Sequence, residues 1–371
     1  MTPAASAPLD MRGTPQARGR AQAALCPDSA AAMRAQLTAR LDGARDLLAR
    51  PRVAKFLDAQ WAFANRYDAE GIAEMAGVAE GYGVDPRALF AFLHAGQLGG
   101  LPVDGCSAWA YVDPAQGAVL VKNRDLRGPA LPLQRVFRHT DPAWGGRSVL
   151  CVGSLGAPGA YSSGINSDGF ALVDTQVVTT DQGVGLLRYF MMTRLLAHCA
   201  SVEAAIDELR GMPQAGGGTL VLADATGAIA AVEIGHSAVA VARPATRWVA
   251  RTNHFLSPEL IGRLAAHPGD PGIDDSQARL ATLSSWLGAR QACPSLDAAA
   301  AVMASHDTPD GAGLCRHGGQ AGSTTISCSI FACTAQTLHF ATGNPCEGAW
   351  SRYDLARDAG VRDGVRNESG R

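Results

Sequence analysis

The sequence changes character near residues 99–105, and this change constrains the fold more than any other feature. Residues 28–98 are rich in Ala, Arg, Leu, Met and Gln, which favour helices. Helices are predicted over residues 30–48, 56–67 and 69–82, and from residue 86 onward. Pro51 separates the first two, Gly83 ends the third, and Asp85 is the predicted N-cap of the fourth.

From residue 106 onward, short runs of β-favouring residues alternate with turn residues. Strands are predicted over residues 107–112, 118–121, 148–152, 169–173, 218–223, 228–234, 238–241, 247–250 and 325–331. The first two runs are expected to form a hairpin, as are the two runs within residues 221–234. Helical stretches interrupt the strands at residues 185–200, 202–209, 276–287 and 296–304. This alternation predicts a layered α+β fold rather than a parallel doubly wound sheet.

The length and composition indicate a folded protein with a large core. A chain of 371 residues corresponds to one or two domains, and its hydrophobic fraction of 47% argues against global disorder. Lys and Arg number 32 against 34 Asp and Glu, which gives a formal net charge of -2. Because nucleic-acid-binding proteins carry a basic excess, no nucleic-acid partner is expected.

The N-terminus and the cysteines bear on the location of the protein. Residues 1–27 scatter Pro and Gly among small residues, so they are predicted to be a disordered tail, and Met1 and Met11 both remain possible starts. No secretory signal and no transmembrane run are recognised, and no membrane partner is expected. Nine cysteines, an odd number, are predicted to be mostly reduced thiols in a cytoplasmic protein.

Several common chemistries lack their motifs. The sequence contains no GxSxG, HExxH, GxxxxGK[ST] or CxxC pattern. Cysteines and histidines do gather near the C-terminal end: Cys315, His317, Cys328, Cys333, His339 and Cys346. Their spacings are poor for zinc, since Cys328 and Cys333 would point to opposite faces of a strand. Buried thiols are therefore predicted, with no metal and no cofactor.

The segment at the junction of the helical and β blocks carries the most informative chemistry. Gly105-Cys106 is followed sixteen residues later by Lys122-Asn123-Arg124-Asp125, at the end of the next predicted strand. A hairpin of this length would bring a thiol, a lysine, an arginine and an aspartate together, and nearby charges can make a thiol nucleophilic. The ordinary alternatives are a buried cysteine and a turn at a strand end.

Collinear motifs make the chain resemble the penicillin acyltransferase-type family of autoproteolytic acyltransferases and amidases, within the N-terminal nucleophile (Ntn) hydrolase superfamily. The family is typified by acyl-coenzyme A:6-aminopenicillanic acid acyltransferase, also called isopenicillin N acyltransferase. The matching segments, within residues 30–350, are Gly105-Cys106, Lys122 to Asp125, Asn166-Ser167-Asp168-Gly169, residues 187–196, Asp224 to Glu233, Thr252-Asn253-His254, Cys315-Arg316 and Gly343-Asn344-Pro345-Cys346. The resemblance implies a four-layer αββα sandwich of two antiparallel sheets.

The resemblance also implies that the chain is an inactive zymogen that cuts itself between Gly105 and Cys106. Residues 28–105 would then form a helical small chain and residues 106–371 a catalytic large chain, both in one structural domain and still associated. The freed α-amine of Cys106, which titrates near pH 8, would serve as the base for its own thiol.

Roles carry over to matching residues. Cys106 is the implied nucleophile, Asp125 orients its amine, and Asn253 donates its side-chain amide to the oxyanion hole. From the residues alone, Asn253 would instead be a turn-capping asparagine after the 247–250 strand. Lys122 departs from the arginine found there in the related bile-salt and penicillin-V hydrolases, which weakens any claim to their substrates.

Lys122, Arg124 and His254 are the expected substrate-binding residues. Strand alternation places Lys122 and Arg124 on one face, which could be the pocket or a solvated surface. For His254, a packed structural role is favoured over that of a base, because the α-amine already fills that role.

The expected activity is cleavage of non-peptide-chain amide bonds in small N-acyl amines or amino-acid conjugates, through an acyl-cysteine thioester. Water is the expected acceptor, with an amine as the alternative, and the oligomeric state is left open. A catalytically silent member that only binds acyl amides is the alternative function. A Cys–His dyad peptidase would need His94, His254 or His306 near Cys106, and the spacing does not favour it.

Overall fold

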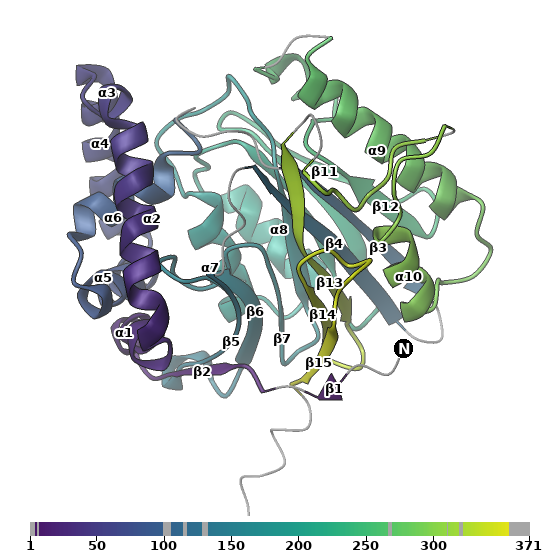
Figure 1. Cartoon of the computed structure of the whole chain (residues 1–371), viewed down its shortest axis with the longest axis horizontal. Helices are drawn as coiled ribbons and strands as arrows, with labels where there is room; N and C mark the ends of the chain where they lie inside the picture. Colours follow the sequence, from purple (N-terminus) through teal and green to yellow (C-terminus); the bar gives the residue numbers. More distant parts are fainter. Residues whose placement is uncertain are drawn as a thin grey trace, which may run out of the picture.

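Two mainly antiparallel β-sheets lie face to face at the centre of the protein, and helices cover the outer face of each (Figure 1). The structure is a computed structural model that describes residues 4–5, 7–98, 105–113, 117–127, 133–265, 269–309, 311–318 and 322–355. The predicted α+β fold, a four-layer αββα sandwich, is confirmed.

The strands fall into a seven-stranded and an eight-stranded sheet. The first has the spatial order β1 (Ala4–Ala5), β15 (Trp350–Asp354), β14 (Thr337–Thr342), β13 (Ser323–Ala332), β4 (Gly117–Arg127), β3 (Cys106–Asp113), β12 (Trp248–Arg251). The second has the order β11 (Val239–Ala242), β10 (Ile229–Ile234), β9 (Gly218–Ala223), β8 (Ala171–Gln176), β7 (Ser163–Asn166), β6 (Ser148–Ser154), β5 (Gln134–Thr140), β2 (Leu9–Arg12). Only the edge pairings of β1 with β15 and β2 with β5 are parallel within the described residues.

Both faces of the central strands are buried, which explains why the sequence shows continuous apolar runs there. In β6, Leu150 and Val152 face the core between the sheets, whereas Val149 and Cys151 face the helices. β8 and β9 alternate in the same way. A strand buried on both faces needs no polar positions, so a period of two is hidden in its sequence.

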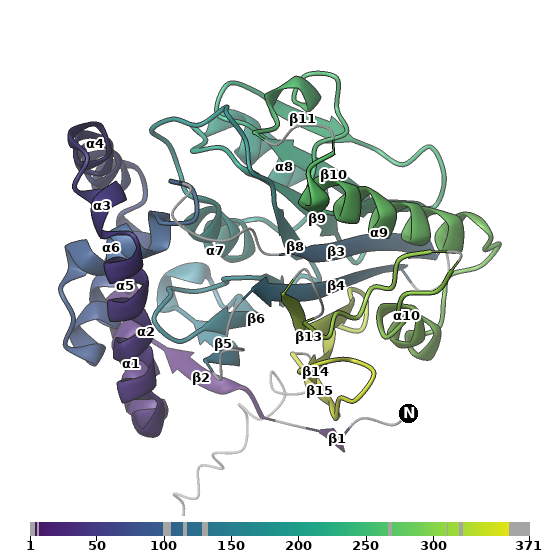
Figure 2. The same ribbon diagram turned by 45° about the horizontal axis from the view of Figure 1, so that its top comes forward.

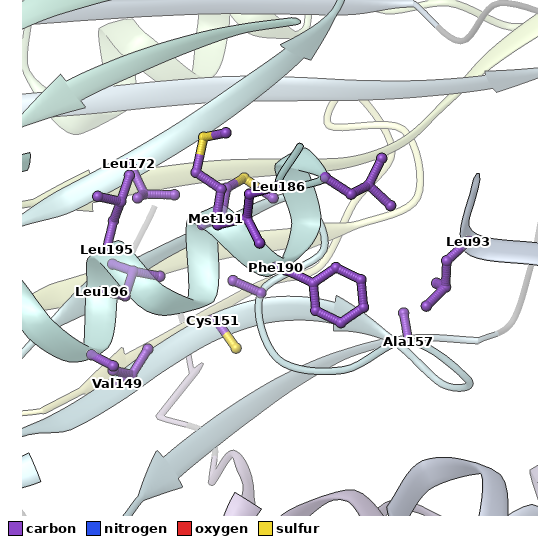
Figure 3. Packing of buried hydrophobic residues seen from close by; sticks show 14 of the residues in the cluster. Leu93, Val149, Cys151, Ala157, Leu172, Leu186, Phe190, Met191, Leu195 and Leu196 are labelled. Carbon is purple, nitrogen blue, oxygen red and sulfur yellow. The ribbon is translucent and has the colours of Figure 1, made fainter. Parts of the chain in front are cut away.

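Eight of the described helices lie on the outer side of the eight-stranded sheet, and all but the third contribute buried or partly buried apolar residues to the core there. They are α1 (Pro15–Leu25), α2 (Ala30–Gly43), α3 (Arg45–Leu48), α4 (Pro51–Tyr67), α5 (Ala69–Tyr82), α6 (Pro86–His94), α7 (Arg188–His198) and α8 (Val202–Gly211). The first six gather at one side of the molecule (Figure 2). Figure 3 shows Phe190, Met191, Leu195 and Leu196 of α7 packed over the sheet. Among the described helices, none has the length and apolarity needed to cross a membrane.

The seven-stranded sheet is covered by α9 (Pro271–Gly288) and α10 (Leu296–Met303). Trp109 and Tyr111 of β3 point to this side and pack with Leu283 and Leu287 of α9. The described residues also form three short 3₁₀ helices: η1 (Pro27–Ser29), η2 (Pro142–Trp144) and η3 (Ile261–Arg263). The α9–α10 layer matters for function because its inner face also reaches the start of β3.

Most predicted elements are confirmed in kind. Two helices match closely: α5 ends at Gly83 in the left-handed conformation, and the Asp85 side chain caps α6 by accepting from the Ala88 backbone N–H. The two predicted hairpins are β3–β4 and β9–β10. Six of the described strands were not predicted: β1 and β2 in the N-terminal segment, and β5, β7, β14 and β15. β5 and β15 lie near sheet edges and carry charged residues, and β7 is only four residues long.

The prediction of a disordered tail over residues 1–27 is wrong for residues 9–25, which form β2 and α1. Arg18 of α1 is 1% exposed and pairs with the buried carboxylates of Glu74 and Asp141. Gly19 and Gly77 let α1 and α5 touch through their backbones, since a Cβ on Gly19 would lie 2.0 Å from the Glu74 carbonyl oxygen. Scattered glycines here mark close helix packing rather than disorder.

Candidate active site

The β3–β4 hairpin brings Cys106 beside the charged residues of β4, as predicted. Cys106 lies opposite Arg124, and Ala108 lies opposite Lys122. Alternation places Cys106, Lys122 and Arg124 on the face toward the second sheet. Lys122 and Arg124 do bond to groups on that side, whereas Asn123 points to the α10 side. Lys122 is 2% and Arg124 8% exposed, so the alternative of a solvated face is wrong.

Gly105 is fitted tightly against Asp125. The Asp125 backbone N–H donates to the Gly105 carbonyl oxygen over 2.8 Å. A Cβ on Gly105 would lie 2.8 Å from Asp125 Oδ2 and 3.1 Å from its Cβ. Any larger residue before Cys106 would therefore displace the Asp125 side chain. Residues 99–104, which precede Gly105, lie outside the described residues.

The Asp125 carboxyl group is almost completely buried. The Thr325 hydroxyl of β13 donates to Asp125 Oδ1 over 2.6 Å. Burial raises the pKa of Asp125 above its usual range, and the charge of Arg279 and the Thr325 hydrogen bond oppose this shift only in part. A carboxyl group in this setting holds its proton more readily than one in water.

Asn253 lies in the loop after β12 and bonds directly to Cys106. Its Oδ1 accepts from the Cys106 backbone N–H at 2.8 Å and from Arg279 Nη2 at 2.9 Å. Because a guanidinium group only donates, the atom facing Arg279 must be oxygen, which fixes the orientation of the amide. The Nδ2 atom donates to the Gln176 carbonyl oxygen at 2.9 Å. Asn253 therefore bridges β3 and the end of β8, which a turn-capping role would not require.

The loop that carries Asn253 is held from two sides. Buried Glu233 of β10 accepts from Arg251 Nε through Oε1 and from the Leu256 and Ser257 backbone N–H groups through Oε2. Ser276 of α9 accepts from the Asn253 backbone N–H over 2.8 Å. These bonds fix the backbone at Asn253, so its side chain is not needed to hold the loop.

Arg279 is a site residue that the sequence did not reveal. It is 2% exposed and donates from Nη1 to the Cys106 carbonyl oxygen at 2.6 Å and to Ser107 Oγ at 2.9 Å. Its Nε pairs with Asp275 at 2.9 Å. Burial lowers the pKa of Arg279, and the negative charges of Asp125 and Cys106 oppose this shift. The available signal was an arginine at a buried position of the α9 stripe formed by Ser276, Arg279, Leu283 and Leu287.

A second group of charges lies beneath the same face. Lys122 and Arg188 of α7 both pair with Asp174 of β8, and all three are buried. Despite its burial, the two cations lower the pKa of Asp174. Arg188 and Arg279 both interact electrostatically with the Cys106 thiol. Cations near a thiol favour its thiolate form.

Arg124 has a different environment from Lys122. It donates to Gln134 Oε1 at 3.0 Å and to Ser154 Oγ at 3.2 Å, and its guanidinium lies 5.3 Å from the centre of the Tyr161 ring. Tyr161 in turn stacks on Tyr189 with ring centres 4.0 Å apart. Arg124 thus lies among neutral hydrogen-bond acceptors next to an aromatic pair.

The predicted histidine occupies a structural setting. His254 Nδ1 lies 2.8 Å from Ser276 Oγ, and burial and the charge of Arg279 lower its pKa, so the ring is neutral near pH 7. His94 bonds to the Phe90 carbonyl and Gln60, and His306 lies beside His317. The contact of His254 with Ser276 and its burial fit the packed structural role favoured for this histidine.

A hollow of about 820 Å³ lies on the outer side of α9, away from this group. Its lining comes from α9 and residues 289–290, 305–308 and 311–312, rather than from Cys106 or Asn253. The outer hollow is therefore separate from the candidate active site at the start of β3.

A family model matches more than half of the chain. Residues 112–347 match the family model described as acyl-coenzyme A:6-aminopenicillanic acid acyl-transferase. The matched region includes Asp125, Asn253 and Arg279 and begins after Cys106. No curated protein sequence gives a significant match.

Two solved structures are similar in part. A mutant of the conjugated bile acid hydrolase from Clostridium perfringens has 10% identity and a TM-score of 0.42, over 68% of this chain and 93% of that one. Penicillin V acylase from Agrobacterium tumefaciens has 14% identity and a TM-score of 0.33, over 69% of this chain and 80% of that one.

Proposed function

The chain belongs to the acyl-coenzyme A:6-aminopenicillanic acid acyl-transferase family, and from that premise we propose that it is a self-processing amide hydrolase or acyltransferase with Cys106 as nucleophile. Its substrates are small N-acyl amines or amino-acid conjugates. Their C–N amide bonds are cleaved through an acyl-cysteine thioester, with water as the default acceptor.

One observation carries this proposal, namely the hydrogen bonding around the Gly105–Cys106 peptide. The Gly105 carbonyl oxygen accepts from the Asp125 N–H, and the Cys106 N–H donates to Asn253 Oδ1, each over 2.8 Å. A backbone donor on a carbonyl oxygen stabilises the negative charge that develops when the carbon is attacked. The bond that would be cut is thus the one whose oxygen and nitrogen are both held.

This arrangement supports self-processing. The Cys106 sulfur attacks the Gly105 carbonyl carbon, the C–N bond breaks, and the thiol proton ends on the Cys106 nitrogen. Water then hydrolyses the thioester, which leaves a Gly105 carboxylate and a Cys106 α-amine. Asp125, with its raised pKa, lies next to the reacting carbonyl and is the group available to exchange a proton there.

In turnover, the new amine takes the thiol proton and the sulfur attacks the substrate carbonyl. Asn253 Oδ1 accepts a hydrogen of this amine and so directs its lone pair. Asn253 Nδ2 carries a second hydrogen beyond the one given to Gln176, which allows the predicted donation to the oxyanion. The leaving amine receives the proton, and water releases the acyl group from the thioester.

The charges near the thiol support amino-acid conjugates within the substrate class. Lys122, Arg124 and Arg188 supply three buried cations, and Asp174 pairs with two of them. The remaining positive charge favours a substrate that carries a carboxylate. Arg124, with neutral oxygens as partners, is the best placed of the predicted binding residues to meet it.

The two chains produced by processing are proposed to stay associated. Met33 and Leu37 of α2 and Met75 and Val78 of α5 share one core with Phe137 and other strand residues of the second sheet. Separation would expose this apolar surface to water, which is unfavourable.

The test is a screen of the purified protein against N-acyl amines and N-acyl amino acids, with released amine measured by mass spectrometry. Rapid acid quenching should trap an acyl adduct on the peptide that begins with Cys106. Cys106→Ala should abolish both amine release and adduct, and Asp125→Asn should lose most activity. Cys293→Ser, at a half-buried thiol elsewhere, is the matched control and should behave as wild type.

Asn253→Ala separates catalysis from binding. A lost transition-state contact lowers kcat far more than it raises KM, typically by about 100- to 1,000-fold for an oxyanion donor. Binding of acyl amides without amine release by the wild-type protein would instead support a catalytically silent member and overturn the proposal.

A further inference from the structure

Four side chains from two loops meet beside the seven-stranded sheet. They are His306, Cys315, His317 and Cys346, and one ligand atom from each lies within 4.8 Å of every other. His306 follows α10, Cys315 and His317 precede β13, and Cys346 follows β14. Two sulfurs and two imidazole nitrogens form the donor set that zinc prefers.

Four of the six separations between the ligand atoms are close to those of a tetrahedron around one ion. His306 Nε2 and His317 Nε2 are 3.2 Å apart, the two sulfurs are 3.6 Å apart, and His317 Nε2 is 3.6 Å from Cys315 Sγ and 3.2 Å from Cys346 Sγ. Zn–S bonds of about 2.3 Å and Zn–N bonds of about 2.0–2.1 Å place tetrahedral ligand atoms about 3.3–3.8 Å apart. We propose that these four residues bind one Zn²⁺ ion in a closed, structural site.

The backbone around the four ligands is fixed by its own hydrogen bonds. Both the Leu314 and Cys315 N–H groups donate to the Ser305 carbonyl oxygen, at 3.0 and 2.9 Å. Gly313 makes this approach possible, because a Cβ there would lie 2.3 Å from the carbonyl carbon of His306. His306 and Cys315 are thus held side by side before any metal binds.

Surrounding groups complete the site in the manner usual for metal ligands. The Asn344 side-chain amide donates to Cys315 Sγ at 3.3 Å and to the Arg316 carbonyl oxygen at 2.6 Å. His317 Nδ1, the nitrogen away from the cluster, lies 3.7 Å from Glu347 Oε1. A carboxylate behind a ligating histidine orients the ring and raises its basicity.

The sequence hid this site because its ligands come from two separate loops, the α10–β13 loop and the β14–β15 loop. The order His306, Cys315, His317, Cys346 contains no CxxC or HxxxH pair, and neighbouring Cys328 and Cys333 are fully buried in or beside β13. The 3.6 Å between the Cys315 and Cys346 sulfurs is far longer than the roughly 2.05 Å of a disulfide. Zinc binding would release the two thiol protons and leave a neutral Zn(thiolate)₂(imidazole)₂ unit.

The site is connected to the candidate active site through Arg316. The Arg316 backbone N–H donates to Thr325 Oγ1 at 2.8 Å, and that hydroxyl donates to Asp125. The Arg316 side chain pairs with Asp275, which also pairs with Arg279. Zinc would therefore stabilise the loop that helps to position Asp125 and Arg279. The zinc site itself does not depend on the proposed function.

The test uses the full-length protein, purified with a reducing agent and without chelators. Elemental analysis should find one zinc per chain. After chelation, titration with Co²⁺ alone should give the thiolate-to-cobalt absorption of a tetrahedral site, which Zn²⁺ then displaces. Because loss of an outer partner typically costs about 10–100-fold in affinity, Cys346→Ser and His306→Ala should each weaken zinc binding at least about 100-fold.

Controls and contrary results are defined on the same protein. Cys293→Ser should keep full zinc content, and Glu347→Gln should weaken binding by about 10-fold, as expected for an outer partner. Co²⁺ binding without thiolate absorption, zinc content unchanged in both ligand variants, or no zinc bound by the reduced protein would overturn the proposal. A Cys315–Cys346 disulfide that persists in the reducing preparation would do so as well.

Discussion

Two buried arginines organise two different regions of the molecule. Arg18 is a residue of α1, on the helical side of the molecule, and its side chain reaches Glu74 of α5. Arg279 lies in α9 and contacts the start of β3. Their exposures are 1% and 2%, so both guanidinium groups have left water. Arg18 pairs with two buried carboxylates, those of Glu74 and Asp141. Arg279 pairs with one, Asp275, and directs its other donors to neutral oxygens of Cys106, Ser107 and Asn253.

The difference separates a structural ion cluster from a chemical one. Around Arg18 the cation is enclosed by two carboxylates. Glu74 also accepts from the Gly159 backbone N–H, so the cluster fastens α1 to the sheet loops. Around Arg279 the donors are aimed at the peptide that carries the candidate nucleophile. A buried cation bonded to neutral oxygens leaves positive potential where negative charge develops in acyl transfer.

The largest expected effect is the loss of stability caused by Arg18→Gln. Removal of the guanidinium leaves Glu74 and Asp141 buried without their counter-ion, so the free energy of unfolding should fall by about 3–5 kcal/mol. The specific activity of the molecules that remain folded should not change. Chemical denaturation and activity per folded molecule are the measurements.

Arg20→Gln is the matched control for Arg18. Arg20 is on the same helix, but its pair with Glu80 is exposed, with both side chains 49% accessible. Its loss should leave stability almost unchanged. Equal destabilisation by the two variants would show that the Arg18 cluster does not hold α1.

Arg279→Gln should instead lower the activity of the folded protein. The glutamine loses donors to the Cys106 carbonyl and Asn253, so processing and kcat should fall about 100- to 1,000-fold, or about 2.7–4 kcal/mol of barrier. Steady-state kinetics, with Arg290→Gln just beyond the end of α9 as control, measure this. A variant that turned over normally would remove Arg279 from the site.

A smaller effect concerns pH in the Arg18 region. Burial lowers the pKa of His139, which lies near Glu74 and Arg18, from 6.5 to about 4. Because the folded pKa is below the unfolded one, the stabilisation is present above about pH 6.5 and is lost as the pH falls toward 4. At pH 5 the loss is about 2 kcal/mol relative to pH 7.

His139→Phe tests the origin of this pH dependence. Neither ring nitrogen of His139 has a hydrogen-bond partner, so an apolar ring should be tolerated at pH 7. Denaturation curves at pH 7 and 5 should show a smaller acid destabilisation than in wild type. Exposed His198→Phe should leave the pH slope as it is, and an unchanged slope in His139→Phe would assign the acid sensitivity to other groups.

Local patterns in the sequence predicted much of the fold and the first half of the site. Gly83, Asp85 and Pro86 mark helix ends through backbone chemistry that needs no tertiary context. The hairpin placed Cys106 beside Lys122 and Arg124 for the same reason. α1 was mistaken for a tail because its stability comes from contacts with α5, which composition does not encode.

The other half of the site depends on long-range packing. Arg279 joins Cys106 across 173 residues and Asn253 across 26. Lys122 and Arg188 meet at Asp174 through the stacking of two sheets, which no local period specifies. Such contacts become visible only when layers are assembled.

The most direct test of the account is N-terminal sequencing and intact mass of the purified protein. Cleavage between Gly105 and Cys106 divides the 371 residues and 38.4 kDa into chains of about 11 and 27 kDa in proportion to length. We expect these two chains to co-purify. The larger chain should begin Cys-Ser-Ala-Trp, and the Cys106→Ala variant should stay a single chain. An active enzyme that remains one full-length chain would contradict it, because a Cys106 nitrogen locked in a peptide bond cannot act as a base.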